Sequence, residues 1–319
     1  MACNNILLIG GSGFVGGWLA NRLVELGLRV RIPTRRHESA RHLTLLPTVE
    51  TVVADVHDPA TLRRLLQGQD AVINLVGILH DRDSRQPYGS GFARAHAELP
   101  QKIVDAMLAS DVRRLVHMSA LGTAPDAPSE YLRSKAAGEA AVLAAQDRLD
   151  VTVFRPSVIF GAGDAFLTLF AKLLRSAPFF PLAGARARFQ PVFAGDVAWA
   201  FADCLDRPET FGQRYDLAGP QVYTLRQLVE YTGALSGHPR PIFELSDGLA
   251  QLQANVLKLL PNPPMTPDNL RSMQVDNVSD GAHDYPGWAP AALEAVAPGY
   301  LTTHAAKKRF DDFRLRAGR

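Results

Sequence analysis

The stretch ILLIGGSGFVGG, residues 6–17, decides the fold. A short apolar run leads directly into a glycine-rich turn, and helical spacing of apolar residues begins at Val15. Gly10, Gly13 and Gly16 stand three apart, which leaves no side chain where a backbone must approach a pyrophosphate or where a helix must pack closely on a strand. The free amides and the dipole of the helix N-terminus then face an anion. This arrangement predicts a dinucleotide-binding turn.

Strand-like and helix-like segments alternate through the first half of the chain. After residues 6–9, the expected strands are 28–33, 49–55, 71–77, 113–119 and 153–161. Such alternation predicts an α/β fold of the Rossmann type, with a doubly wound parallel sheet. We expect residues 1–160 to form this domain, with 191–219 returning to its sheet. Residues 161–319 are expected to form a smaller, mostly helical C-terminal region for a substrate or a partner.

The end of the second expected strand bears on the choice of cofactor. A dinucleotide fold that prefers NAD carries an acidic residue there for the ribose 2'-hydroxyl, whereas this chain has Thr34, Arg35 and Arg36. Arginine can pair with a 2'-phosphate through charge-assisted hydrogen bonds, so we predict NADP(H) in preference to NAD(H). The alternative is a pair of solvated loop arginines. Asp55, after the third strand, could accept from an adenine amino group or be a plain loop aspartate.

A serine, a tyrosine and a lysine follow in an order that suggests proton chemistry. Ser119 ends the fifth expected strand, and Tyr131 and Lys135 stand four apart at the start of an alanine-rich helix, on one face. A nearby ammonium lowers the pKa of a phenol, which would make Tyr131 a general acid or base near neutral pH. Ser119 would hold a carbonyl or hydroxyl against it. His80, in the polar loop 80–91, is a weaker candidate, because lone loop histidines are usually neither acid nor base.

These motifs resemble the extended or atypical branch of the short-chain dehydrogenase/reductase superfamily, which includes NAD-dependent epimerase/dehydratase-like proteins. Three further motifs narrow the resemblance: YLRSKAAGE (131–139), QPVFAGDV (190–197) and MTPDNLR (265–271). Over residues 4–280 the chain is similar to the nucleotide-holding accessory subunit of mitochondrial complex I and its bacterial relatives. The resemblance implies an NADP(H)-binding Rossmann domain. In the mitochondrial subunit the nucleotide is thought to be structural.

By that resemblance, Tyr131 and Lys135 would hold the nicotinamide ribose, and residues 156–158 would lie beside the nicotinamide. The expected catalytic residues are Ser119, Tyr131 and Lys135. The expected cofactor contacts are Gly10, Ser12, Gly13, Phe14, Val15, Gly16, Thr34, Arg35, Arg36, Asp55, Val56, Val76, Gly77, Tyr131, Lys135, Pro156, Ser157 and Val158. Two functions stay open: an oxidoreductase acting on an unidentified small molecule, and a non-catalytic accessory or assembly subunit with a respiratory-chain partner.

Composition narrows the partners and the compartment. The chain has 319 residues, a net charge of +2 and 47% hydrophobic residues, which does not favour a nucleic acid or another polyanion. Its two cysteines, Cys3 and Cys204, have no metal-ligand spacing, so we expect no metal site and a reducing compartment. No apolar run approaches the roughly 20 residues that span a bilayer, and no signal peptide is recognisable. We expect a cytoplasmic protein, or one held at the inner membrane through a complex.

The C-terminal region carries an apolar stripe at helical spacing. It consists of Leu249, Leu252, Val256, Leu259 and Leu260. We expect this stripe to pack in the core; the alternative is a docking face for a membrane subunit or an apolar substrate. The basic tail is expected to be a solvated helix end; it carries Lys307, Lys308, Arg309, Arg314, Arg316 and Arg319.

Overall fold

The computed structural model describes residues 3–81, 83–261 and 263–302. The basic tail therefore lies outside the described residues. The chain forms two compact units. Within the described residues, the first unit comprises 3–156, 194–217 and 279–288, and the second comprises 157–193, 218–278 and 289–302.

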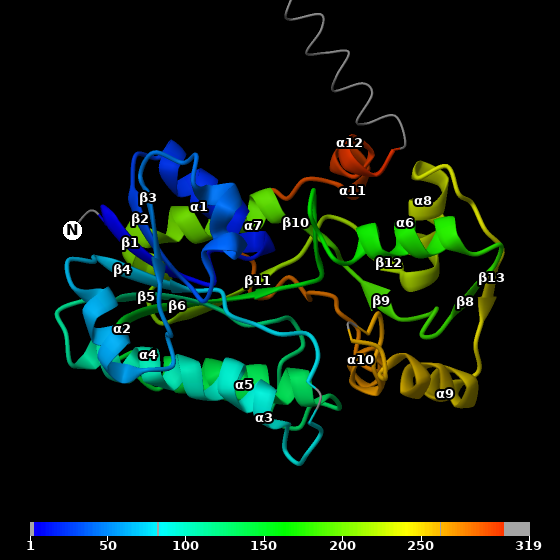
Figure 1. The fold of residues 1–319 in the computed structure, drawn as a ribbon, viewed down its shortest axis with the longest axis horizontal. Helices are drawn as coiled ribbons and strands as arrows, with labels where there is room; N and C mark the ends of the chain where they lie inside the picture. The colour runs from blue at the N-terminus through cyan, green and yellow to red at the C-terminus, as the bar shows by residue number, and fades with distance from the viewer. Residues whose placement is uncertain (1–2, 82, 262, 303–319) are drawn as a thin grey trace, which may run out of the picture. The chain divides into compact units, whose positions relative to one another are not determined.

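The first unit is built on a seven-stranded sheet in which every pairing is parallel (Figure 1). The strand order is β11-β6-β5-β4-β1-β2-β3. The bounds are β1 Asn5–Ile9, β2 Arg29–Thr34, β3 Val49–Val53, β4 Ala71–Asn74, β5 Arg114–Met118, β6 Asp150–Pro156 and β11 Gln213–Leu217. The order reverses direction at β1, so this is the Rossmann-type doubly wound sheet that the sequence predicts.

Helices cover both faces of this sheet. Figure 1 shows α1 (Phe14–Glu25) and α7 (Ala194–Asp203) on one face and α2 (Pro59–Leu66), α4 (Leu99–Leu108) and α5 (Glu130–Leu143) on the other. Alternate residues of the central strands point to the second face, where they form one buried apolar cluster with these helices. The cluster includes Leu7, Val72, Leu115, Val153, Leu99, Ile103 and Val142. Strands β4 and β5 are buried along their whole length, so residues of both faces are covered, as is typical of a parallel sheet.

Local signals in the sequence set the ends of these helices. The Asp58 side chain accepts a hydrogen bond from the amide of Thr61 at 2.9 Å, and Pro59 occupies the first turn, so α2 begins there. Helix α1 ends where Gly27 adopts a φ of 77°, and the Gly27 amide donates to the Val24 carbonyl. The sequence predicts both features, because Asp58 and Pro59 form a typical helix start and Gly27 stands where a C-cap belongs.

Two segments differ from the sequence prediction. The expected strand 153–161 divides into β6 and a separate short strand, β7 (Ile159–Phe160), which pairs with β10 (Val192–Phe193) in the second unit. The ladder of β6 with β11 ends at Pro156, and two residues later the Val158 amide donates to Asn277 Oδ1 at 2.9 Å instead of to a strand. The sequence also predicts one helix over residues 92–109, which the structure divides into α3 (Ser90–Phe92), a π-helical stretch (Ala93–Glu98) and α4.

The second unit is smaller and mostly helical. Its helices are α6 Leu167–Ser176, α8 Leu225–Leu235, α9 Asp247–Leu257, α10 Pro267–Ser272, α11 Leu293–Val296 and α12 Pro298–Leu301. Its other short strands are β8 Phe180–Leu182, which pairs with β13 Ile242–Glu244, and β9 Arg188–Phe189, which pairs with β12 Tyr223–Thr224. Helices α6 and α8 share a buried apolar core that includes Phe170, Leu174, Leu225 and Val229.

The apolar stripe of α9 is not in a core. The helix buries Ala250 and Ala254, two small residues that allow close packing. The residues expected to be buried are instead exposed: Leu249 54%, Leu252 60% and Val256 58% on α9, and Leu259 85% and Leu260 49% in the turn that follows it. The prediction of core packing was therefore wrong for this stripe. Among the described helices, none is long and apolar enough to cross a membrane.

Candidate dinucleotide site

The glycine turn between β1 and α1 has the geometry that close backbone packing requires. Gly10 has a φ of 87°, which disfavours a side chain. A β-carbon at Gly16 would lie 2.5 Å from the carbonyl oxygens of both Gly10 and Gly11. Gly13 is the N-cap of α1, and no side-chain cap hydrogen bond is made there. The first-turn amides of a 12-residue helix are thus available to an anion.

The end of β2 presents two arginines. Thr34 is buried, and its hydroxyl donates to the Arg36 carbonyl at 2.9 Å, which fixes the turn after the strand. Arg35 and Arg36 are exposed, and neither side chain forms an ion pair or hydrogen bond with the described residues. Both guanidinium groups therefore keep their donors for an external anion.

Asp55 follows β3 and has local partners. Its Oδ1 accepts from the His57 amide at 2.9 Å, and its Oδ2 lies 3.8 Å from Arg94 Nη2. The side chain is still 60% exposed. Val56, the next residue, packs partly against the apolar cluster under the sheet.

Helix α5 carries a row of three polar residues. It begins where Ser129 Oγ accepts from the Leu132 amide at 3.2 Å, and Tyr131, Lys135 and Glu139 follow at intervals of four. Buried Lys135 Nζ donates to the Met118 carbonyl at 3.0 Å and to the Val76 carbonyl at 3.3 Å.

Lys135 therefore bridges the ends of β4 and β5. Val76 lies against the glycine turn, because a β-carbon on Gly10 would be 3.1 Å from the Val76 amide. Gly77 also lies close to the lysine, because a β-carbon added at Gly77 would be 3.3 Å from Lys135 Nζ. Burial lowers the pKa of Lys135 to about 8. The structure thus connects the glycine turn to the tyrosine helix through one buried amine.

The pKa of Tyr131 differs from the expectation. We expected the Lys135 ammonium to lower it, but burial of the phenol raises the pKa of Tyr131 to about 12. The ring packs edge-on against His96, with 5.5 Å between ring centroids, and against Phe92. Tyr131 is a neutral phenol at physiological pH, which can donate a proton but is a poor base.

Ser119 is tied to a buried ion pair that the sequence analysis did not identify. Its hydroxyl donates to Glu139 Oε2 at 2.7 Å, and Arg155 Nε donates to the same oxygen at 2.9 Å. Burial alone would raise the pKa of Glu139, but the hydrogen bonds from Arg155 and Ser119 hold it below its usual value. Because its proton is directed to Glu139, Ser119 offers only lone pairs to another group.

Two buried histidines lie near these residues and were not predicted. His96 lies in the π-helical stretch, where Nε2 accepts from the Ile78 amide at 2.9 Å and Nδ1 lies 2.8 Å from Ser134 Oγ. His117 Nδ1 lies 3.2 Å from Asn74 Nδ2. The signal for His117 was its place two residues before Ser119 on the same strand face. A π-helical stretch, which often marks a functional site, has no comparable sequence signal.

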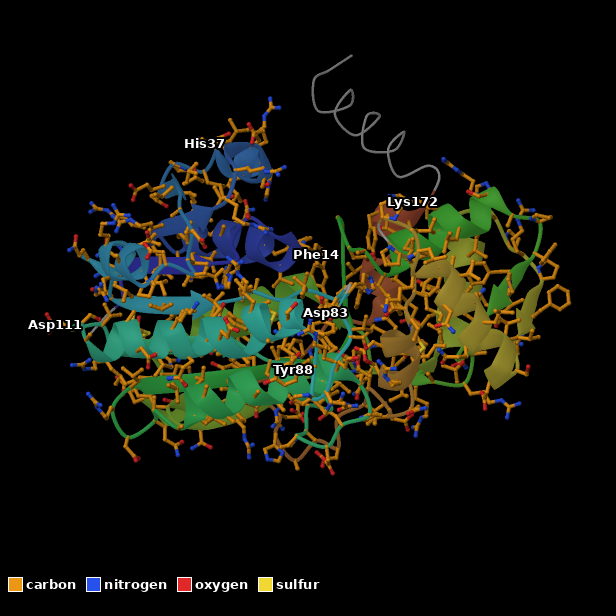
Figure 2. The ribbon with its side chains drawn as sticks, turned by 60° about the horizontal axis from the view of Figure 1, so that its bottom comes forward. Phe14, His37, Asp83, Tyr88, Asp111 and Lys172 are labelled. Carbon is orange, nitrogen blue, oxygen red and sulfur yellow. The ribbon has the colours of Figure 1, made fainter. Side chains whose placement is uncertain are left out.

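The remaining expected residues fall in different places. Figure 2 shows Phe14, Asp83 and Tyr88 at one end of the first unit's sheet and Asp111 at the other, so the segment 83–91 lies at the carboxyl end of the strands. Pro156 ends β6 in the first unit, whereas Ser157 and Val158 belong to the second. His80 lies half-buried in the loop after β4.

A parallel sheet of this order, with a glycine turn before the first helix, defines a Rossmann-type dinucleotide-binding protein. Residues 6–218 match the family model of the NAD dependent epimerase/dehydratase family. The chain belongs to that family.

Named relatives differ in what they do. The chain is 30% identical over 294 residues to the mitochondrial NADH dehydrogenase (ubiquinone) 1 alpha subcomplex subunit 9 of Arabidopsis thaliana, covering 86% of this chain and 71% of that protein. It is 29% identical over 196 residues to the ceramide reductase of Caulobacter vibrioides, covering 60% of this chain and 58% of that enzyme. The crystal structure of the Bordetella bronchiseptica enzyme WbmF in complex with NAD+ superposes with a TM-score of 0.65 at 20% identity, covering 76% of this chain and 81% of WbmF.

Proposed function

We propose that this protein is an NADP(H)-binding oxidoreductase whose Ser119, Tyr131 and Lys135 act at the reacting carbon-oxygen bond of a small substrate. The observation that carries the proposal is the position of buried Lys135. Its Nζ donates to the carbonyl of Val76, which lies against the glycine turn, and to the carbonyl of Met118, the residue before Ser119. The first unit holds the dinucleotide in this proposal, and the second supplies contacts for a substrate or a partner. A bound nicotinamide would donate or accept the hydride.

The proposed roles follow from the protonation states. Tyr131 is neutral, so it donates its proton to the developing alkoxide of a carbonyl that is being reduced. Lys135 has donated two of its three N–H groups to backbone carbonyls, which leaves one for a ribose hydroxyl. Ser119, held by Glu139, accepts a hydrogen bond and orients the substrate.

Replacing Tyr131 by Phe tests the catalytic role. The Tyr131→Phe variant should lose about 100-fold or more of its turnover, because general acids contribute at least that factor. NADPH affinity, measured by isothermal titration, should stay close to that of the unaltered protein. The assay follows NADPH oxidation with a panel of aldehydes and ketones. Tyr215→Phe, in β11, is the control; equal turnover in both variants would remove the assignment.

Replacing the two arginines after β2 tests the predicted preference for NADP(H) over NAD(H). The Arg35→Ala/Arg36→Ala double variant should lower NADPH affinity by about 10-fold to 100-fold, since a hydrogen bond to a charged group contributes roughly 1.5–3 kcal/mol. NADH affinity should barely change, because NADH lacks the 2'-phosphate. Arg29→Ala, an exposed arginine at the other end of the same strand, is the matched control. An unchanged ratio of NADPH affinity to NADH affinity would show that these arginines do not determine the cofactor preference.

A second function, a nucleotide-stabilised accessory or assembly subunit of a respiratory complex, has its own support. The Arabidopsis thaliana relative is named as a subunit of NADH dehydrogenase (ubiquinone), and the exposed apolar face of α9 offers a place for a protein partner. Mass spectrometry of the nucleotide released on denaturation separates the two functions. About one NADP(H) per chain after dialysis would favour the structural cofactor. A protein that releases NADPH on dialysis and rebinds it would favour the enzyme.

A further inference from the structure

Asp216 holds a buried oxygen without a partner. The residue lies near the end of β11 and is only 7% exposed. Among the described residues, its Oδ1 has no hydrogen-bond donor. A buried carboxylate oxygen in this situation is costly unless a cation or a donor meets it.

Two more ligand groups reach the same place from the segment 279–288. One ligand atom from each of Asp216, Asp280 and His283 can be chosen so that all three lie within 4.8 Å of one another. The backbone fixes this arrangement, because the Asp216 amide donates to the His283 carbonyl at 2.8 Å and Asp216 forms a parallel bridge with Asp284. Asp280 and His283 are exposed, so both side chains can change rotamer.

The local charge does not already satisfy Asp216. Asp280 and Asp284 add negative charge around it. Arg155 exerts the largest charge effect, which is positive, and His283 adds a smaller one of the same sign, but the Arg155 guanidinium donates its hydrogen bonds to Glu139. A cation at the centre of the three ligand atoms would offset this excess of carboxylate charge.

We propose that Asp216, Asp280 and His283 bind a divalent transition-metal ion of the zinc class. Two carboxylate oxygens and one imidazole nitrogen form a mixed set that suits Zn²⁺, whereas Mg²⁺ and Ca²⁺ prefer oxygen ligands throughout. Ligands at about 2.0–2.2 Å from zinc lie roughly 3.5 Å apart, and the three ligand atoms already lie within 4.8 Å of one another, so small rotamer changes of the exposed Asp280 and His283 would bring them into range. Water would complete the tetrahedron.

This proposal departs from our expectation of no metal site. The ligands stand on a strand and a distant loop, so no short motif of ligand spacing connects them in the sequence. Bound zinc would fasten the segment 279–288 to β11, and its effect would be on stability. The site needs no dinucleotide, so the proposal stands apart from the proposed oxidoreductase function.

The test uses the full chain, stripped with EDTA and dialysed, with zinc chloride as the probe. We expect isothermal titration to give one zinc per chain and thermal unfolding to shift upward with zinc. Asp216→Asn and His283→Ala should each weaken zinc binding by about tenfold or more, as loss of a ligand requires. Asp284→Asn, the matched control beside the site, should keep the affinity within about twofold, which separates ligation from general attraction by charge.

Three results would overturn the proposal. Absence of a one-to-one zinc isotherm would show that Asp216 is satisfied by a proton or a water instead. Equal weakening by Asp284→Asn would show a diffuse acidic patch. Magnesium binding as tightly as zinc would exclude the assigned metal class. Because His283 is exposed, His283→Ala should fold even if Asp216→Asn does not, and its zinc affinity then decides the question.

Discussion

Lowering the pH from 6.5 to 5 should reduce the free energy of unfolding by about 3 kcal/mol. Two buried histidines stay neutral in the folded protein over this range, whereas the same two histidines take up protons in the unfolded chain. Burial, with smaller contributions from Lys135 and His117, lowers the pKa of His96 to about 2. Burial, together with Lys135, lowers the pKa of His117 to about 3. With folded pKa values below the usual 6.5, their contribution to stability is complete above pH 6.5 and is lost as the pH falls.

The hydrogen bonds explain why neither ring accepts a proton. His96 Nε2 is the acceptor for the Ile78 amide, so its proton sits on Nδ1, which donates to Ser134 Oγ. Protonating His96 would break the bond to Ile78, which begins the loop leading to Tyr88. Asn74 uses its oxygen for the Val76 amide, so its amide group donates to His117 Nδ1. Protonation would break that bond as well.

Urea unfolding at several pH values measures this effect. His96→Gln and His117→Gln should each remove about half of the fall in unfolding free energy between pH 6.5 and 5, whatever they do to the stability at pH 6.5. The exposed His37 provides a control, since His37→Gln should leave the slope unchanged. Burial raises the pKa of Asp216, which acts in the opposite sense, so each variant is compared with the unaltered chain. An unchanged slope in the double variant would contradict this account.

The sequence identifies the scaffold of the site because the scaffold depends on local chemistry. Apolar runs, the Asp58 cap and Gly27 each act within a few residues of themselves, and they predict the alternation of strands and helices. The position of Lys135 on one face with Tyr131 follows from helical spacing alone. These features need no knowledge of what packs against them.

The partners across the sheet could not be predicted in the same way. Glu139 lies on the tyrosine helix, but its role depends on Arg155, a residue of β6, and on Ser119 after β5. The raised pKa of Tyr131 depends on burial, which spacing does not reveal. Helix α9 shows the converse, because its leucines have the spacing of a core and the structure buries its alanines instead. Burial is a property of the whole fold.

Two adjacent glycines of α1 should respond in opposite directions to alanine. Helix propensity alone favours alanine over glycine by about 1 kcal/mol at either position. A β-carbon on Gly17 would approach His42 Nε2 at 3.3 Å, and that exposed side chain can move away. Gly17→Ala should therefore fold with equal or slightly higher stability and bind NADPH normally.

Gly16→Ala should lose dinucleotide binding, because its β-carbon would lie 2.5 Å from two backbone carbonyls that cannot move without opening the turn. A shift of that kind costs about 1–3 kcal/mol, and 3 kcal/mol corresponds to roughly a 100-fold loss of affinity. Isothermal titration with NADPH measures the affinity, and urea unfolding without nucleotide measures the cost to the fold. If Gly16→Ala bound NADPH as tightly as Gly17→Ala, the anion would not be held at this turn, and the proposed cofactor site would have to lie elsewhere on the sheet.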